Sequence, residues 1–284
     1  MALHHTIQKI LLTGVTRTPA PAQTEPRPPA ILLPLIDAVA ASHRRFNARA
    51  IDYGNRYRSA FWAIYLLSAV AVLCAVLPLA LGWDDAASGM GHFSVVWVVA
   101  ELLVIASVGL IYWRGHQQDW QGQWLAARTQ AELAWYLPLI APLVDFSTAA
   151  TATNWYIRLL DPAHQLETGT DIDALCSAHE AGVGELLREA WLSPQFVVAY
   201  AQWAADLLEG QRQYHARIAE RQHALQHRVH AINTCLFGLT ALGAASHLLV
   251  HSKILTLVTT FFPALGASLH GALAQSEAYR LEAT

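Results

Sequence analysis

Four stretches of the chain are apolar on all sides, which is the pattern of a helix that crosses a lipid bilayer. The clearest is 93–113, FSVVWVVAELLVIASVGLIYW, with 21 residues and a single charged side chain. A helix needs about 20 mostly apolar residues to cross a hydrocarbon core about 30 Å thick. The same test selects 60–81, 231–250 and 254–274. The pattern therefore predicts four transmembrane helices.

Short connections predict how these four stretches pair. The segment GWDDAASGMGH separates the first two stretches, and only HSK separates the last two. Helices joined by such short connections are antiparallel neighbours. We therefore expect an all-α membrane protein with two transmembrane hairpins, one in 60–113 and one in 230–284, the second followed by a short tail.

The helical pattern continues beyond the membrane between the two hairpins. After Trp113, apolar positions recur at intervals of three, four and seven residues, which predicts a stalk that ends at Pro138 and Pro142. A second long helix is predicted from about residue 195 into the third stretch. We expect these two stalks to pack as an antiparallel pair in a helical cytoplasmic domain, residues 114–229.

The residues before the first stretch divide into two parts. The opening MALHHTIQKILLTGV has a short apolar run but lacks the basic region and cleavage site of a signal peptide. The following residues are rich in proline, so we expect 1–34 to be a flexible, linker-like segment. Residues 35–59 have a helical period with arginines on the polar face. This pattern predicts a basic juxtamembrane helix, and the alternative is an ordinary solvated helix.

Composition supports the membrane interpretation and excludes other classes. The 284 residues are 54% hydrophobic and 14% charged, whereas soluble domains carry about 25% charged residues. A net charge of -3 does not fit a nucleic-acid-binding protein, which carries a basic patch. Cys74, Cys176 and Cys235 are interpreted as free thiols. Phosphate-loop, dinucleotide-binding and nucleophile-elbow motifs are absent from the sequence, so we predict no enzyme and no cofactor.

The distribution of basic residues predicts the orientation in the membrane. Arginines flank the four stretches only on the sides that face the termini and the middle region: Arg44, Arg45, Arg49, Arg56, Arg58, Arg114, Arg128, Arg212, Arg217, Arg221, Arg228 and Arg280. The two connections within the hairpins contain Lys253 alone. Basic residues near membrane spans are retained on the cytoplasmic side. We therefore expect both termini and the middle region to be cytoplasmic.

Glu101 is the one charged residue in the middle of the second stretch. Placing a carboxylate at the centre of a bilayer costs about 2.5–3.5 kcal/mol or more, so such a residue faces a partner, a cavity or a subunit interface. One interpretation is a pore-lining or gating residue. The other is a neutral side chain bonded to a neighbouring helix, with Ser68 and His247 as candidate partners. We count His247 with Glu101 and Pro263 as the candidate pore or gating residues.

Pro263 lies near the middle of the fourth stretch. Proline removes one backbone hydrogen bond and kinks a helix, so this residue is either a gating hinge or a fixed kink between packed helices. The small residues that follow it offer a face for close helix packing: Gly266, Ala267, Ser268 and Gly271.

Three histidines are spaced for one face of the helix that enters the third stretch. His223, His227 and His230 lie at i, i+4 and i+7, and two imidazoles at i and i+4 can bind zinc. The HExxH pattern and a cysteine cluster are both missing. The alternative is a polar, pH-sensitive helix face at the membrane surface.

Several segments of this chain resemble one bacterial group. They are GNRYRSAF at 54–61, WQGQWLAARTQAELAWYL at 120–137, QRQYHARIAERQHALQHRVH at 211–230 and FFPALGASLHGALAQSEAYRL at 261–281. Over about residues 40–282 the chain is similar to the SLATT and related SMODS-associated two- and four-transmembrane effectors. The resemblance implies a bacterial inner-membrane pore-former or membrane disruptor in defence against phage. It also implies a cyclic nucleotide trigger made by a partner synthase.

Two classes of function follow from these patterns. The first is a ligand-gated membrane effector, triggered by a cyclic nucleotide or by a cytoplasmic protein. Four spans enclose little aqueous space, so a pore would need a homo-oligomer in the lipid bilayer. The second is a non-conducting membrane anchor or scaffold that recruits a cytoplasmic partner through its middle region.

Overall fold

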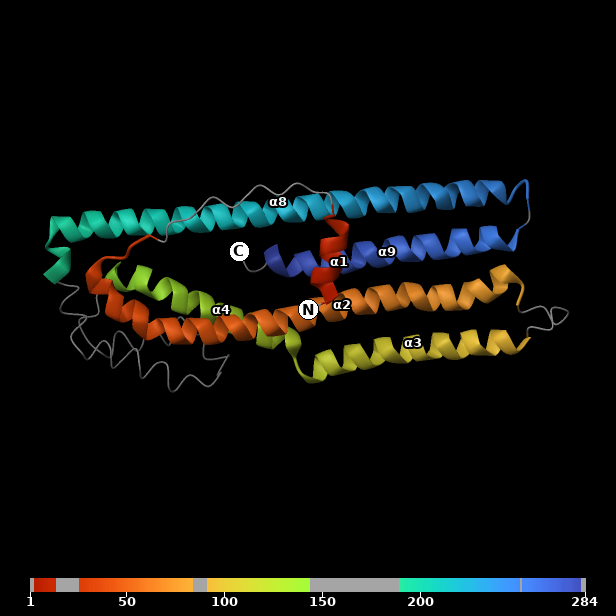
Figure 1. Cartoon of the computed structure of the whole chain (residues 1–284), viewed down its shortest axis with the longest axis horizontal. Helices are drawn as coiled ribbons and strands as arrows, with labels where there is room; N and C mark the ends of the chain where they lie inside the picture. Colours follow the sequence, from red (N-terminus) through yellow and green to blue (C-terminus); the bar gives the residue numbers. More distant parts are fainter. Residues whose placement is uncertain (1–2, 14–25, 84–90, 144–188, 251, 282–284) are drawn as a thin grey trace. The chain divides into compact units, whose positions relative to one another are not determined.

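The computed structural model describes residues 3–13, 26–83, 91–143, 189–250 and 252–281, and all regular structure in these ranges is helical (Figure 1). In chain order the elements are α1 (Leu3–Leu11), η1 (Ala30–Leu32), α2 (Leu33–Leu81), α3 (Gly91–Gln117), α4 (Trp120–Ile140), η3 (Ala141–Leu143), α8 (Pro194–Ser246) and α9 (Lys253–Leu281). The predicted all-α class is confirmed for the described residues.

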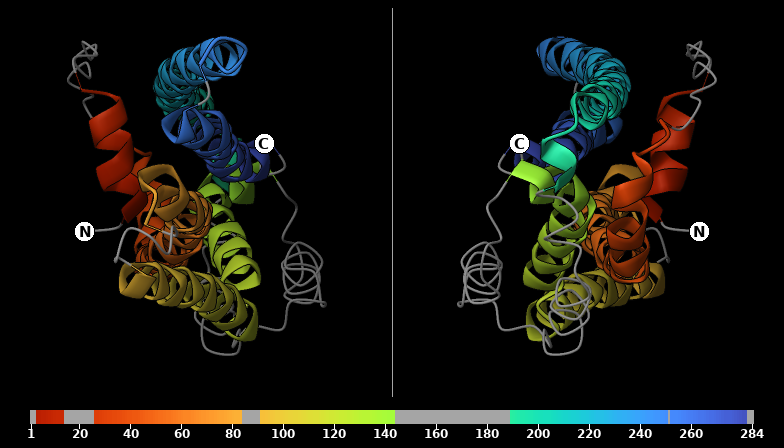
Figure 2. Two further views of the ribbon diagram at one scale, coloured as in Figure 1. Left: turned by 90° about the vertical axis from the view of Figure 1, so that its right-hand side faces the viewer. Right: turned by 90° about the vertical axis from the view of Figure 1, so that its left-hand side faces the viewer.

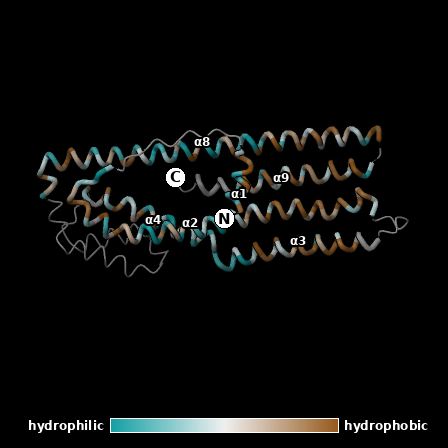
Figure 3. The backbone as a smooth tube through the Cα atoms, in the orientation of Figure 1, coloured by the Kyte–Doolittle hydropathy of each residue, from teal (hydrophilic) through white to brown (hydrophobic). Residues whose placement is uncertain are grey.

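Four helices are long and apolar enough to cross a membrane: α2, α3, α8 and α9. Figure 3 shows that hydrophobic residues concentrate in the C-terminal parts of α2 and α8 and along α3 and α9. With 49 and 53 residues and a rise of about 1.5 Å per residue, α2 and α8 are each more than twice as long as a bilayer core is thick. Only the apolar part of each is therefore needed to span it.

The predicted juxtamembrane helix and first span form one continuous helix, α2. Pro34 lies in its first turn, where a missing N–H is tolerated, and the next proline is Pro78 near its end. No helix-breaking residue other than Gly54 lies between these prolines, so the helical hydrogen bonds continue without interruption. The predicted long helix into the third stretch is likewise confirmed, as α8.

The first stalk differs from the prediction because the chain turns between α3 and α4. Asp119 has a backbone φ of 42°, a left-handed conformation that aspartate adopts more readily than most residues. The side chain of Trp120 closes the turn by donating a hydrogen bond to Gln118 Oε1 at 2.8 Å. Pro138 lies within α4 instead of ending it, and Pro142 lies in η3.

The N-terminal segment also differs from the flexible linker that we expected over 1–34. Residues Leu3–Leu11 form α1, which is strongly amphipathic, and residues 14–25 lie outside the described ranges. Helix formation here follows from burial, because His4 is 1% exposed and Leu12 is also buried. A short amphipathic helix gains most of its stability from packing one face against other elements.

The chain divides into two compact units. Unit 2 comprises 17–54 and 121–218, and its core contains Leu32, Tyr200 and Trp203. Tyr200 donates a hydrogen bond to the Leu139 carbonyl, and His43 Nδ1 donates to the Ala131 carbonyl at 2.9 Å. The start of α2, the end of α4 and the start of α8 are therefore held together within this unit.

Unit 1 comprises 1–16, 55–120 and 219–284. Within it α8 and α9 share a cluster of buried side chains that includes Leu225, Val229 and Leu273. Helices α9 and α2 approach closely at Gly271, where an added Cβ would lie 2.5 Å from Tyr65 Cε1. This contact confirms that the small residues after Pro263 permit close helix packing.

Candidate functional site

Glu101 lies on one partly buried face of α3. This face, which we call the Glu101 stripe, repeats every four and three residues and consists of Trp97, Glu101, Val104, Val108, Ile111 and Gly115. Most other described positions of α3 are exposed, and no residue of its most apolar window is buried. In the described ranges, the side chain of Glu101 makes no hydrogen bond or ion pair. The carboxyl group therefore lies on the one face of α3 that meets other residues of unit 1.

The two partners considered for Glu101 lie elsewhere. Ser68 donates its hydroxyl hydrogen to the Ile64 carbonyl of its own helix at 2.8 Å. His247 lies in the turn after α8, where its backbone N–H donates to the Gly243 carbonyl at 3.2 Å. Neither side chain bonds to Glu101, and His247 is at the end of an apolar stretch.

Pro263 lies within α9, which is helical from Lys253 to Leu281. The structure thus places the three predicted pore or gating residues on different elements: the middle of α3, the turn after α8 and the middle of α9. Among these three described residues no hydrogen bond is formed. Glu101 alone combines an ionisable group with a central position in an apolar helix.

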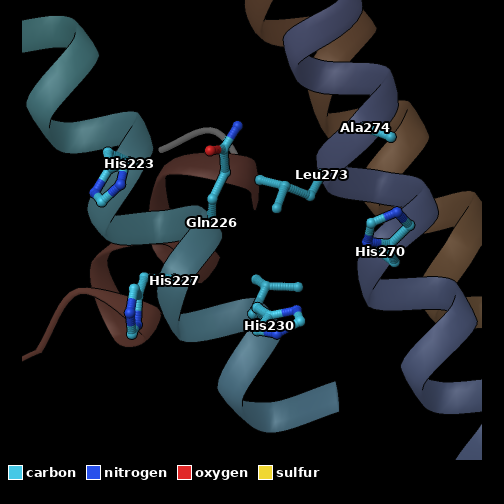
Figure 4. A pocket seen from close by; sticks show the side chains of 8 residues that line it. His223, Gln226, His227, His230, His270, Leu273 and Ala274 are labelled. Carbon is cyan, nitrogen blue, oxygen red and sulfur yellow. The ribbon is translucent and has the colours of Figure 1, made fainter. Parts of the chain in front are cut away.

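The predicted histidine face borders a groove at α8 and α9, and Figure 4 shows His223 and His227 on the side of α8 that faces away from α9. The groove has a volume of about 390 Å³ and is lined by His223, Gln226, His227, Val229, His230, His270, Leu273 and Ala274. Figure 4 shows His230 and His270 projecting from the two helices into the space between them. We call this site the histidine groove.

The geometry of the histidine groove does not favour the metal alternative. Zinc requires imidazole nitrogens within about 2.1 Å of one ion. The rings of His223 and His227 have their centroids 6.3 Å apart. Within the described residues, no group of three or more histidine, cysteine or acidic side chains could hold a metal ion.

Helix α1 joins three other helices of unit 1, as Figure 1 and Figure 2 show. His4 Nδ1 lies 3.1 Å from Ser59 Oγ of α2, and Arg221 of α8 donates to Gln8 Oε1 at 3.1 Å. Leu12, directly after α1, packs in the buried cluster of α8 and α9. Helix α1 therefore links α2 to the α8–α9 pair.

The buried imidazole of α1 is uncharged at neutral pH. The pKa of His4 is lowered from 6.5 to about 4, first by burial and then by the nearby positive groups His5, Arg58 and Arg221 in that order of size. Its Nε2 is buried and has no hydrogen-bond partner among the residues that the structure describes. A proton on His4 would therefore be both desolvated and repelled, so α1 docks more stably when the imidazole is neutral.

Comparison with known proteins assigns no relative to this chain. No protein-family model matches its sequence, and no characterised protein or solved structure matches it. The functional interpretation therefore depends on the residues and the geometry described above.

Two features of this region were missed at the level of sequence. His270 was not considered because it follows Pro263 in an apolar stretch and is distant in sequence from the other histidines. His270 lies near the end of 254–274, and His230 directly precedes 231–250. These matching positions in two antiparallel stretches could have predicted that the two histidines lie close together. The repeat of His4, Ile7 and Leu11 could likewise have predicted α1.

Proposed function

We propose that this protein is a membrane effector that permeabilises a bilayer when its cytoplasmic part receives a signal. The observation that carries the proposal is the position of Glu101. It lies at the centre of an apolar helix, on the face that is consistently partly buried among the described side chains of α3, residues 95–117. Placing a carboxylate at that depth in a bilayer is unfavourable in free energy unless the carboxylate lines a water-filled path or bonds to a partner.

The proposed topology has two transmembrane hairpins with a helical cytoplasmic domain between them. The apolar parts of α2 and α3 form the first hairpin, and those of α8 and α9 form the second. Unit 2 is the cytoplasmic domain, and both termini lie on the same side. The support is the distribution of arginine, which avoids both short connections within the hairpins. The membrane is the bacterial inner membrane, as the resemblance implies.

The conducting form is a homo-oligomer. A bundle of four helices encloses space for side chains and little water, so one copy does not form a channel. Helix α3 exposes large apolar side chains, including Leu102, Leu103 and Leu110 at about 60% exposure each. Lipid or another copy covers these side chains in a membrane. When the assembly opens, the Glu101 stripe lines the aqueous path.

The signal reaches the membrane through helices that are continuous between the units. Helix α2 contains residues of both units, and so does α8. A helix transmits a displacement along its axis because its backbone hydrogen bonds resist bending. A cyclic nucleotide or a cytoplasmic protein that binds unit 2 therefore acts on α2 and α8 directly. The cyclic nucleotide is the trigger that the resemblance implies.

One observation favours a second candidate, the non-conducting scaffold. The cytoplasmic part of α8 exposes Val198 and Leu208, which are 69% and 52% accessible. Apolar side chains of this kind mark protein-binding surfaces when they gather in a patch. In the scaffold alternative, this surface recruits a soluble partner and the spans act only as an anchor.

Leakage from liposomes separates the two candidates. The full chain is reconstituted and dye and ion release are measured with a panel of cyclic di- and trinucleotides. The effector predicts release with one of the ligands and a changed release in Glu101→Gln. The matched control is Glu189→Gln, an exposed carboxylate in unit 2, which should leave release unchanged. Correctly inserted protein that releases nothing under any ligand would instead support the scaffold.

A further inference from the structure

The histidine groove lies where two apolar helices end. His230 directly precedes the apolar stretch 231–250 of α8, and His270 lies in the last part of the stretch 254–274 of α9. Since 231–250 and 254–274 are joined by a short connection at their other ends, His230 and His270 lie at the same level. For helices that cross a bilayer, this level is the boundary between hydrocarbon and water. The placement of the histidine groove at this boundary requires only that α8 and α9 cross the bilayer. It does not require that the protein is an effector.

The lining of the groove is suited to an anion with an apolar neighbour. Four imidazoles and the Gln226 amide supply hydrogen-bond donors, and none of the lining residues is acidic. Imidazole donates to phosphate oxygens, and protonation strengthens such bonds by adding charge. Val229 and Leu273, which are 0% and 5% exposed, form a buried apolar part of the lining.

The size of the groove also limits its occupant. A water molecule has a share of about 30 Å³ in the liquid, so a groove of about 390 Å³ accommodates much more than one small ion. Among the described residues, no group of three or more histidine, cysteine or acidic side chains is spaced to hold a metal ion. A phosphate group carried on a larger, partly apolar molecule matches the size, the donors and the apolar lining together.

We propose that the histidine groove binds the phosphate headgroup of an anionic phospholipid. The phosphate accepts hydrogen bonds from His230, His270 and Gln226, and the glycerol and first acyl carbons pack against Ala274 and the accessible edge of Leu273. His223 and His227, farther along α8 from the apolar stretch, form the outer part of the site. A lipid is favoured over a soluble phosphate because the groove is at the membrane boundary and its buried part is apolar.

Binding of a lipid in the histidine groove also affects the docking of α1. Leu12 packs in one cluster with Val229 and Leu273, and these two residues also line the groove. A lipid that packs against Leu273 therefore adds to the contacts of the cluster on which α1 docks. Binding of the lipid and docking of α1 are linked, so each strengthens the other.

The test measures the binding of phosphatidic acid and phosphatidylcholine to the full chain in detergent by native mass spectrometry. We expect phosphatidic acid to bind more tightly, and the double variant His230→Ala, His270→Ala to bind it about tenfold more weakly, the loss expected for charge-assisted hydrogen bonds. The matched control is His247→Ala, in the turn at the far end of α8, which should bind like the unaltered chain. All groove histidines are exposed, so these changes spare the core.

A second variant and a competitor complete the test. Gln226→Glu adds a carboxylate to the groove without removing a buried group, and it should weaken binding of phosphatidic acid and leave phosphatidylcholine unchanged. Inorganic phosphate and glycerol phosphate should not displace the lipid at equal concentration. Equal binding by the unaltered chain and both variants would overturn the site. Displacement by glycerol phosphate would overturn the lipid as its ligand and assign a soluble phosphate ester instead.

Discussion

The two units of this chain satisfy their polar side chains in different ways. In unit 2, side chains bond between elements: Tyr200 and Trp191 donate to the carbonyls of Leu139 and Pro142. In unit 1, many hydroxyls donate to the carbonyl four residues earlier in their own helix: Ser68, Ser107, Thr234, Thr240, Ser246 and Thr259. A hydroxyl in hydrocarbon has no water to bond, so it bonds to its own helix.

The two units also differ in how they pack their apolar side chains. Unit 2 packs aromatic rings tightly, with Trp191 and Tyr200 centroids 5.5 Å apart in an edge-on arrangement. Unit 1 leaves many of its apolar side chains exposed, above all along α3. The hydrophobic effect, which stabilises a protein core in water, does not drive the association of helices in lipid. We take this difference as support for the proposal that unit 1 lies in hydrocarbon and unit 2 in water.

The largest expected effect is the loss of an aromatic side chain from the core of unit 2. Trp203 is 5% exposed, so Trp203→Ala should lower the free energy of unfolding by about 3–5 kcal/mol through lost burial and a cavity. Denaturant unfolding of the full chain in detergent measures it by circular dichroism. The comparison variant is Leu103→Ala on α3, which is 63% exposed and should change little. Equal losses would contradict the distinction between the two units.

Acid should weaken the docking of α1 within unit 1. In the undocked segment His4 takes up a proton near pH 6.5, and in the docked helix only near pH 4. The undocked form thus binds more protons between these values, so docking weakens as the pH falls from 6.5 to about 4. One pKa unit corresponds to about 1.4 kcal/mol, which limits the full effect to about 3 kcal/mol.

A spin label on Ile10→Cys, an exposed position of α1, measures this docking in a chain without other cysteines. The mobile fraction should rise over that pH range, and the rise should be much smaller in His4→Leu. His5→Leu alters the exposed neighbouring imidazole and should leave most of the rise. A mobile fraction independent of pH would show that His4 does not control α1.

A smaller effect is expected where α9 approaches α2. Gly271→Ala introduces a Cβ that would lie 2.5 Å from Tyr65 Cε1, so the helices must separate at a cost of about 1–3 kcal/mol. Gly238→Ala is the control because nothing lies within 4 Å of its added Cβ. Thermal unfolding in detergent should show a lower Tm for the first variant only. A neutral Gly271→Ala would mean that α2 and α9 are not packed at this point.

Long-range hydrophobic pattern predicted much of this fold, and local backbone geometry accounts for what it missed. The four apolar helices and the long helix α8 follow from runs of residues whose periodicity extends over many turns. The turn at Asp119 was missed because one residue with a positive φ interrupts a pattern that otherwise continues. Pro138 does not end α4 at once: it removes one hydrogen bond, to the carbonyl of Ala134, and the helix ends two residues later at Ile140.

The candidate site was predicted only in part, for a different physical reason. Glu101 stands out in sequence because a single carboxylate contrasts with an apolar background. The histidine groove needs His270, which the packing of α9 against α8 brings to His230 across 40 positions of sequence. Helix α1 was missed because its stability comes from contacts with distant helices. Sequence pattern identifies elements, whereas contacts between distant elements require the structure.

The most direct test of the central claim is the reactivity of two substituted cysteines on α3 in liposomes. Glu101→Cys lies on the proposed water-lined face and Leu103→Cys on the lipid-facing side, in a chain without other cysteines. A water-soluble thiol reagent is added under conditions that produce leakage. We expect fast modification at position 101 when the trigger is present and slow modification there when it is absent. At position 103 we expect no modification under either condition. Equal reactivity at the two positions, or no reaction at position 101 while dye escapes, would contradict it.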